Sequence, residues 1–401
     1  MRIATSMMFD AGVANINKQW SQLIHLQQQV ASGRRILTPS DDPVAAARVL
    51  EVTQSSDILT QYATNQQNAT SALGLAETQL SSLNDMFARL KELTVQAGNA
   101  TLSASDRKSL AFELRARFDE MIGIANAADG QGQHLFSGYM GDTKPFAGTV
   151  ESGVTYSGDD GQRTLQVSAT RMLEVSDSGK DVFMRIRNGN GDFVTDYAAG
   201  NTGTGVIDGG SMTDPTAWNA LANKPIQIVF TSATAYDIVD ATASVIGSGT
   251  YRSGDPIVFG GASMVITGAP LAGDSFSVAP STSQSVFTTL GNLIVALESG
   301  ATQPADAAKY SNEIGFALRD LDQANDNILR VRSMIGSRMN ELESLDSMNQ
   351  DLQLQYQQTL SNLQDLDYAK AISDLTRKQT DLQAAQQSFV KISQLSLFNY
   401  L

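Results

Sequence analysis

Residues 59–97, LTQYATNQQNATSALGLAETQLSSLNDMFARLKELTVQA, decide the fold of this chain. Apolar side chains in this stretch recur at alternating steps of three and four residues, and they are Leu59, Tyr62, Ala69, Leu73, Ala76, Leu80, Leu83, Phe87, Leu90 and Ala97. This spacing is the a/d pattern of helices that wind around one another. The stretch contains no proline, so nothing in it forces the helix to stop.

A second stretch, towards the C-terminus, has the same repeat. Its seam consists of Ala307, Tyr310, Ile314, Ala317, Leu321, Ala324, Ile328, Val331, Ile335, Leu342, Leu345, Leu352, Tyr356, Leu363 and Leu366. Polar residues interrupt the two seams at Gln66, Arg338, Asn349 and Thr359. Two matching seams at opposite ends predict a helical rod built from both chain ends, with the residues between them as an insertion. Such rods serve as building elements more often than as catalysts.

Composition sets further bounds. The 401 residues suffice for two or three domains. A formal net charge of −14 argues against a nucleic-acid partner, because phosphates would repel an acidic surface. The sequence contains no run of about 18 apolar residues, so it predicts no membrane span. The chain has no cysteine, which excludes disulfides and thiolate chemistry. Residues 1–10 do not read as a cleaved secretory signal, because they lack a continuous apolar core.

The two ends of the chain predict helices with unfilled apolar stripes. A first helix is expected over 6–32 and a last one from Tyr368, with a break near 365–367 where the seam changes phase. Neither helix would be stable alone in water, so we expect their stripes to pair with each other and to pack against neighbouring subunits. The predicted interface residues are Phe9, Val13, Ile16, Trp20, Leu23, Val30, Leu375, Leu382, Phe389, Ile392, Leu395, Leu397 and Phe398.

A short linker is expected between the first two helices. Gly33 supplies a helix stop, and the residue before Pro39 avoids helical geometry. Asp41 and Asp42 are interpreted as helix caps rather than as paired acids or metal ligands, because Pro43 suits the first helical position. The linker residues are Arg34, Arg35, Thr38, Pro39, Asp41, Asp42 and Pro43.

The middle of the chain changes character. A third helix is expected from Ser105 or Asp106 to Asp129, and glycine is frequent from Gly130 onward. Strands are predicted at 164–168, 182–186, 226–230, 256–259 and 275–278, and Asn188-Gly189 predicts a hairpin turn. Helix is expected again from Thr288. The domain division is therefore 1–42 with 367–401 as terminal helices, 43–179 with 284–366 as a helical rod with β-hairpins near 135–178, and 180–283 as a β-rich insertion.

No catalytic or metal-binding motif is found. His25 and His134 have no second ligand at metal spacing, and the polar turn 188–192 lacks the bidentate glutamate of a calcium loop. We therefore expect no enzymatic activity, no cofactor and no metal-site residues, while a structural ion at the turn 188–192 stays open as an alternative.

Four segments resemble one known family. They are MRIATS at 1–6, SGRRILTPSDDPVAAA at 32–47, GQHLFSGY at 132–139 and ISQLSLFNYL at 392–401. They are similar to the flagellar hook-associated protein 3 family, the hook–filament junction proteins of bacteria. The resemblance implies an α+β multidomain, flagellin-like fold, in which the terminal helices line an inner tube and the β insertion faces outward. It implies no enzymatic role.

The resemblance also implies partners and a location. The expected partners are further copies in a ring, the other hook–filament junction protein, flagellin, and an export chaperone on the C-terminal helix. The expected location is the extracellular flagellum, reached by type III export without a cleaved signal peptide. Alternatives left open are flagellin itself, an adhesin or other binding module carried by residues 180–283, and a cytosolic coiled-coil scaffold.

Overall fold

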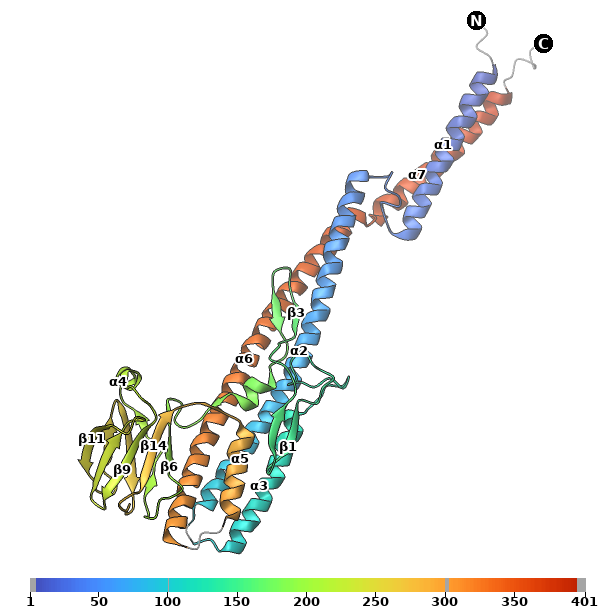
Figure 1. Ribbon diagram of the computed structural model, residues 1–401. Coiled ribbons are helices and arrows are strands. Elements are labelled where there is room, and N and C mark those ends of the chain that lie inside the picture. The colour runs from blue at the N-terminus through green and yellow to red at the C-terminus, as the bar shows by residue number, and fades with distance from the viewer. Residues whose placement is uncertain (1–4, 100, 300–302, 395–401) are drawn as a thin grey trace, which may run out of the picture. The chain divides into compact units, whose positions relative to one another are not determined.

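The computed structural model describes residues 5–99, 101–299 and 303–394 (Figure 1). Contacts divide them into two compact units. Unit 1 contains the described residues up to Thr64 and those from Ser344 onward, and unit 2 is Asn65–Glu343. None of the helices in the described ranges has the length and apolar character that a membrane crossing requires.

The helices are α1 (Thr5–Ser32), α2 (Pro43–Ala97), α3 (Ala104–Ala125), α4 (Pro215–Ala220), α5 (Val286–Glu298), α6 (Pro304–Gln364) and α7 (Tyr368–Gln394). The predictions of the first two helices, of the break near 365–367 and of renewed helix near Thr288 are confirmed. The third helix ends at Ala125 and not at Asp129, so that boundary was wrong. The Asn126 side chain exchanges two 2.9 Å hydrogen bonds with the backbone of Phe146, which turns the chain out of the helix.

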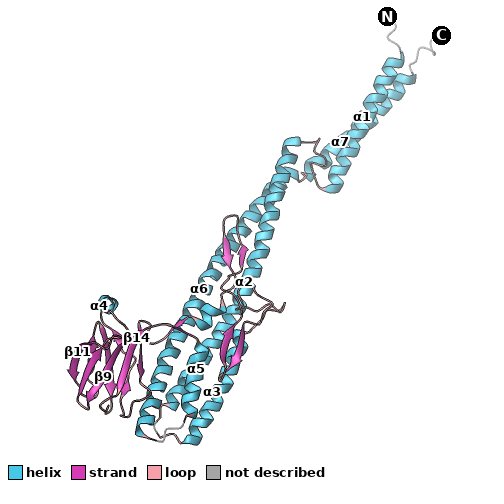
Figure 2. Ribbon diagram, in the orientation of Figure 1, coloured by secondary structure: helices cyan, strands magenta, loops and turns pink. Residues whose placement is uncertain are grey.

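Unit 2 is built around an antiparallel pair formed by α2 and α6 (Figure 2). Arg332 on α6 donates to Glu77 on α2 at 2.6 Å, and the Tyr310 hydroxyl donates to the Ala97 carbonyl at 2.8 Å. The predicted seams are buried here, with Leu73, Leu80, Leu83, Leu90, Leu321 and Ile335 at 0% exposure. Helices α3 and α5 pack against each other in the same bundle.

An aromatic cluster joins the bundle to the irregular segments beside it. The Phe183 ring lies 5.2 Å from that of Phe146 and 5.5 Å from that of Phe136, and the Phe118 ring lies 5.8 Å from that of Phe287. The predicted strand at 182–186 is therefore wrong. Lys180–Met184 forms a π-helical turn, which buries Val182 and Phe183 together on the cluster, whereas a strand would point neighbouring side chains to opposite faces.

Short sheets flank the bundle. They pair β1 (Phe146–Thr149) with β2 (Gly153–Tyr156), β3 (Thr164–Gln166) with β4 (Met172–Glu174), and β5 (Ile186–Arg187) with β15 (Ser283–Gln284). Gly189 does turn the chain at φ +71°, but the strands on either side of it pair elsewhere, β5 with β15 and β6 with β14. The predicted Asn188-Gly189 hairpin is therefore wrong.

A β sandwich occupies most of the middle of unit 2. One sheet has the order β11-β10-β9-β14-β6, and the other has the order β12-β13-β7 with β8 paired to β13. The strands are β6 (Phe193–Tyr197), β7 (Val206–Ile207), β8 (Ser211–Met212), β9 (Ile226–Ser232), β10 (Ala235–Val239), β11 (Val245–Thr250), β12 (Pro256–Phe259), β13 (Ala262–Thr267) and β14 (Ser275–Pro280). Alternating side chains such as Ile226, Ile228 and Phe230 fill the core between the sheets, and the strand predictions at 226–230, 256–259 and 275–278 are confirmed.

Polar side chains of α6 hold the sandwich. Asn312 accepts from the Ile207 amide at 2.8 Å, and Asp320 accepts from the Gly189 amide at 2.9 Å. Glu313 accepts from the Tyr197 hydroxyl at 2.8 Å. Burial, with the nearby Asp196 charge, raises the pKa of the Glu313 carboxyl despite the hydrogen bond from Tyr197. The sandwich is thus attached to α6 both by these hydrogen bonds and by Phe316, which packs against the sandwich core with its ring 6.2 Å from that of Tyr197.

Two phenylalanines of α3 test the burial pattern. Phe118 is 1% exposed and Phe112 is 73% exposed. We expect Phe118→Ala to lower the free energy of unfolding by about 3–5 kcal/mol, because it leaves a cavity. Phe112→Ala should change it by less than about 0.5 kcal/mol. Urea denaturation followed by circular dichroism measures both, and equal effects would contradict the assigned face of α3.

Glu313→Gln should stabilise the chain at pH 7.5, by less than about 1 kcal/mol. A carboxyl whose pKa is raised by folding favours the folded state more as pH falls through that pKa. The advantage of the glutamine variant should therefore shrink as the medium is acidified. Thermal unfolding at pH 7.5 and at lower pH measures this, with the exposed Glu343→Gln on the same helix as the control. A constant difference at every pH would refute the explanation.

Candidate assembly interface

Within unit 1, α1 and α7 run antiparallel and side by side (Figure 1). The Phe9 and Phe389 ring centroids are 4.9 Å apart. Lys378 Nζ donates to Gln22 Oε1 at 3.1 Å further along the pair. Gly12 faces the Phe389 ring so closely that a Cβ there would lie 2.7 Å from it. The first and last helices of the chain thus pair with each other, as their stripes predict.

This pairing buries little of the predicted interface. Leu23 and Leu382 are buried, at 5% exposure each. Ile16, Val30, Leu375 and Phe389 are half-buried, and Phe9, Val13 and Trp20 are exposed. Ile392 lies in α7 but its side chain is outside the description, and Leu395, Leu397 and Phe398 lie outside the described residues.

Further large apolar side chains of unit 1 are exposed, and we call this set, with Phe9, Val13 and Trp20, the apolar surface of unit 1. The additional members are Met7, Ile24, Val44, Leu50, Ile58, Met348, Leu354, Tyr368, Ile372 and Val390. A paired helix can hide only the stripe that faces its partner. Large exposed apolar side chains are the groups that interaction sites use.

The linker between α1 and α2 is bonded to the break between α6 and α7. The Arg35 amide donates to the Gln364 carbonyl at 2.7 Å, and the Leu366 amide donates to the Gly33 carbonyl at 2.9 Å. The Arg35 guanidinium adds a 2.7 Å bond to the Leu363 carbonyl. Gly33 has φ +70°, and a Cβ there would lie 2.8 Å from the Tyr368 hydroxyl. The two helix breaks of unit 1 therefore form one hydrogen-bonded joint.

The two aspartates of the linker differ in role. Asp42 caps α2, because its Oδ1 accepts from the Ala45 amide at 3.0 Å, and this hydrogen bond lowers the pKa of its carboxyl. Asp41 is not a cap, which corrects the prediction. Its Oδ2 accepts from the Leu37 and Thr38 amides at 2.9 Å each, which closes the loop before the helix. These bonds lower the pKa of Asp41, and His25 Nε2 lies 3.5 Å from its Oδ1.

Polar interruptions in the seams carry contacts that the periodicity alone did not indicate. Gln66 donates to the Val167 carbonyl at 2.8 Å, and the Arg338 guanidinium donates to Asp177 at 3.0 Å. These bonds hold the segment that contains the β3–β4 hairpin against α2 and α6. In unit 1, Asn349 donates to the Leu59 carbonyl at 3.0 Å. Their position inside an otherwise apolar seam was the only signal available in the sequence.

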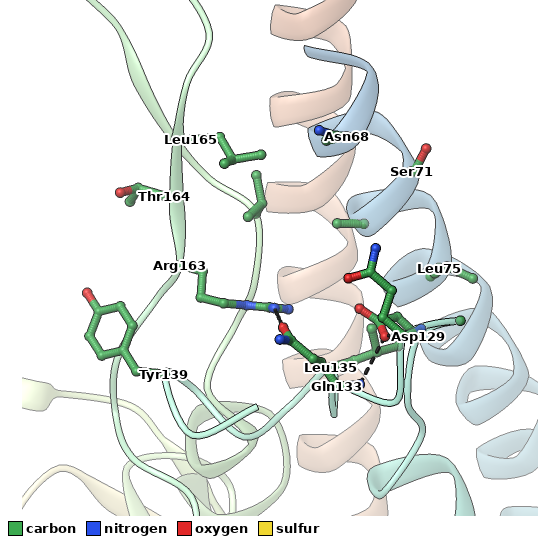
Figure 3. A pocket seen from close by; sticks show the side chains of 14 residues that line it. Asn68, Ser71, Leu75, Asp129, Gln133, Leu135, Tyr139, Arg163, Thr164 and Leu165 are labelled. Carbon is green, nitrogen blue, oxygen red and sulfur yellow. Dashed lines mark hydrogen bonds between the residues drawn. The ribbon is translucent and has the colours of Figure 1, made fainter. Parts of the chain in front are cut away.

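A groove of about 760 Å³ opens in unit 2 (Figure 3). One wall is the face of α2 with Asn68, Ala72 and Leu75, and the other is strand β3 with Leu165. Arg163 reaches across it and donates to Gln133 Oε1 at 2.6 Å. The sequence singled out neither this groove nor Arg163. The described residues hold no group of three or more side chains suited to a metal ion.

Both ends of the chain match models of known protein families. The model of the bacterial flagellin N-terminal helical region matches residues 3–140, and that of the C-terminal helical region matches residues 318–401. Flagellar hook-associated protein 3 of Escherichia coli is 27% identical over 99% of this chain and 99% of its own length.

Two further comparisons show that a junction protein matches a larger share of this chain than a flagellin does. The crystal structure of the flagellar junction protein FlgL from Legionella pneumophila is 32% identical, with a TM-score of 0.71, and covers 79% of this chain and 100% of that protein. Flagellin of Escherichia coli is 36% identical, but only over 31% of this chain and 24% of its own length.

The apolar surface of unit 1 predicts unequal protection of backbone amides in the purified chain. Amides of α1 and α7 should exchange with solvent at least about 100-fold faster than those of residues 69–97 in α2, because they rest on far less buried apolar area. Hydrogen exchange followed by mass spectrometry measures this. Equal protection would mean that the terminal pair is stable without any further partner.

Proposed function

This chain belongs to the family of flagellar hook-associated protein 3, and we propose that it forms the junction between the hook and the filament of a bacterial flagellum. The similarity over 99% of both chains carries the proposal, because it includes the middle of the molecule as well as the flagellin-like ends. The flagellin reading is less favoured, since the Escherichia coli flagellin matches under a third of the chain.

Assembly would use the apolar surface of unit 1. Phe9, Trp20 and their exposed neighbours are too apolar to remain in water, and copies stacked around an axis would bury them. The terminal helices would then gain their full order on assembly, as in coupled folding and binding. The sequence predicts that Ile392, Leu395, Leu397 and Phe398 belong to the same interface.

The proposal assigns a role to each of the three parts of the chain. Residues 1–42 with 367–401 would form the inner, assembling domain, and residues 43–179 with 284–366 the helical domain around it. Residues 180–283, most of which fold as the β sandwich, would face outward. The residues of the joint, Arg34, Arg35, Thr38, Pro39, Asp41, Asp42 and Pro43, would link the inner two domains.

The proposal names four partners. Copies of this chain would form a ring, bounded on one side by the other hook–filament junction protein and on the other by flagellin. An export chaperone would cover the C-terminal helix before assembly, because apolar stripes exposed in the cell invite aggregation. The location would be the extracellular flagellum, reached through the flagellar export channel without a cleaved signal peptide. The role is structural and needs no cofactor.

Deletion of the gene tests the function. The mutant should keep its hooks and release flagellin monomers into the medium, because nothing would seat the first flagellin subunits. Electron microscopy of hooks and immunoblots of the medium measure both. Normal filaments in the mutant would contradict the proposal.

Complementation of the deletion tests the interface. Trp20→Asp, at 51% exposure, should fail to restore filaments, because it places a charge in the apolar surface of unit 1. Val258→Asp, at 60% exposure in the β sandwich, is the matched control and should restore them. Restoration by both variants would remove Trp20 from the interface.

A further inference from the structure

One glycine of the terminal helices breaks a local rule of helix formation. Glycine inside a helix is destabilising, because it loses more conformational freedom on folding than any other residue. Gly12 is the only glycine of α1, and it lies inside the helix, seven residues after its start at Thr5. A residue that weakens its own helix needs a compensating contact elsewhere in the structure.

The space beside Gly12 is filled by another helix. A Cβ on Gly12 would lie 2.7 Å from Cδ2 and 2.7 Å from Cε2 of the Phe389 ring on α7, whereas carbon atoms in contact stay about 3.5–4.0 Å apart. Most other glycines inside the described helices face open space, with nothing within 4 Å of such a Cβ, and these are Gly74, Gly123, Gly315 and Gly336. Gly12 is therefore a packing position and these four are not.

The ring that fills this space has a second contact. Phe389 is the only phenylalanine of α7, and its centroid lies 4.9 Å from that of Phe9 with the two planes tilted by 51°. Aromatic rings at this separation attract each other. Phe9 stands three residues before Gly12, so the two are neighbours on the surface of α1. A methyl group at Gly12 would push the ring away from both.

The heptad repeat alone leaves the register of the two helices open. Apolar residues recur every seven residues in α7, as Leu375, Leu382 and Phe389 do, and the stripe of α1 has the same spacing. A slide of seven residues therefore brings apolar side chains opposite one another again. The glycine removes this ambiguity. Such a slide would set the Phe389 ring against Thr5 or Gln19, and both of these residues carry a Cβ.

A polar contact further along the pair has the same register. Lys378 Nζ donates to Gln22 Oε1 at 3.1 Å. Gln22 lies ten residues after Gly12, and Lys378 lies eleven residues before Phe389. In an antiparallel pair, equal steps in opposite directions keep residues opposite each other, so both contacts belong to one alignment of α1 and α7.

We propose that Gly12 and Phe389 form a steric key that fixes the register of α1 against α7. In this register Leu23 and Leu382 are buried, whereas Trp20 is exposed. The key therefore decides which apolar side chains the pair keeps for itself and which it leaves for assembly. The inference rests on the proposed function for this role, and it adds the two residues that set the surface used there.

Cysteine cross-linking within one copy measures the register, because the chain has no cysteine of its own. Gln22→Cys is combined with Lys378→Cys, and the purified full-length chain is treated at high dilution with a short bismaleimide. We expect a link between these two positions within the monomer, identified by mass spectrometry of the linked peptides. Absence of this link from the monomer overturns the proposal.

A comparison of double variants isolates the contact. Adding Gly12→Ala should slow the linking at least about fivefold, because overpacking outweighs the gain in helix propensity. In a Phe389→Ala background the ring is absent, so Gly12→Ala should not slow the linking. Phe389→Val gives the same comparison with a side chain shorter than the ring. Equal slowing with and without the ring, or no slowing in either case, overturns the steric key.

Gly74→Ala is the matched control for this comparison. It makes the same change inside a helix, but a Cβ at Gly74 meets nothing within 4 Å, so the linking rate should stay at the parent value. Slowing as large as that caused by Gly12→Ala would mean that the rate does not report the register, and it would overturn the proposal.

Complementation of the deletion strain tests the role in assembly. Gly12→Ala should raise the flagellin released into the medium at least about fivefold, in parallel with the slower linking, and Gly74→Ala should leave the release unchanged. Equal release from wild type and Gly12→Ala overturns the role of the key in assembly. Normal filaments in the deletion strain itself overturn the junction function instead, and the cross-linking result on the register is independent of that outcome.

Discussion

Burial of the heptad seam is the constraint on which this structure depends. In unit 2, Leu80 and Leu83 of α2 and Leu321 of α6 are completely buried by the packed helices and the segments beside them. In unit 1, the same kind of stripe meets too few partners, and Leu23 and Leu382 are the only residues of the predicted interface that are buried there, among the described side chains. The same heptad pattern therefore produces a buried core in unit 2 and, in unit 1, a helix pair whose apolar side chains stay largely exposed.

Polar residues inside the seams are attachment points rather than defects. Gln66 and Arg338 leave the apolar repeat, and each holds the segment around the β3–β4 hairpin through a side-chain hydrogen bond. Buried polar groups stabilise a structure only when their partners are in place. The hairpin segment thus accepts from Gln66 Nε2 and Arg338, whereas the buried Gln66 Oε1 meets no hydrogen-bond partner among the residues that the structure describes. The same segment forms one wall of the groove beside Arg163.

The sequence predicted the regular elements well where one period dominates. Helices α1, α2, α6 and α7 and the break between the last two follow from spacing, proline and glycine alone. It failed where packing overrides local pattern. Val182 and Phe183 read as a strand but form a π-helical turn, because the aromatic cluster draws both side chains to one side.

Amino-acid order alone determined that both ends of the chain would be helices with unfilled apolar stripes, because a heptad repeat specifies a face without naming what covers it. Tertiary structure decided which stripes are filled, which polar interruptions find partners and which aromatic stays in water. Phe112 and Phe118 are the same residue type on one helix, and the sequence did not single out Phe112. The packed structure makes Phe118 a core residue and leaves Phe112 exposed, because the rest of the bundle covers only one face of the helix.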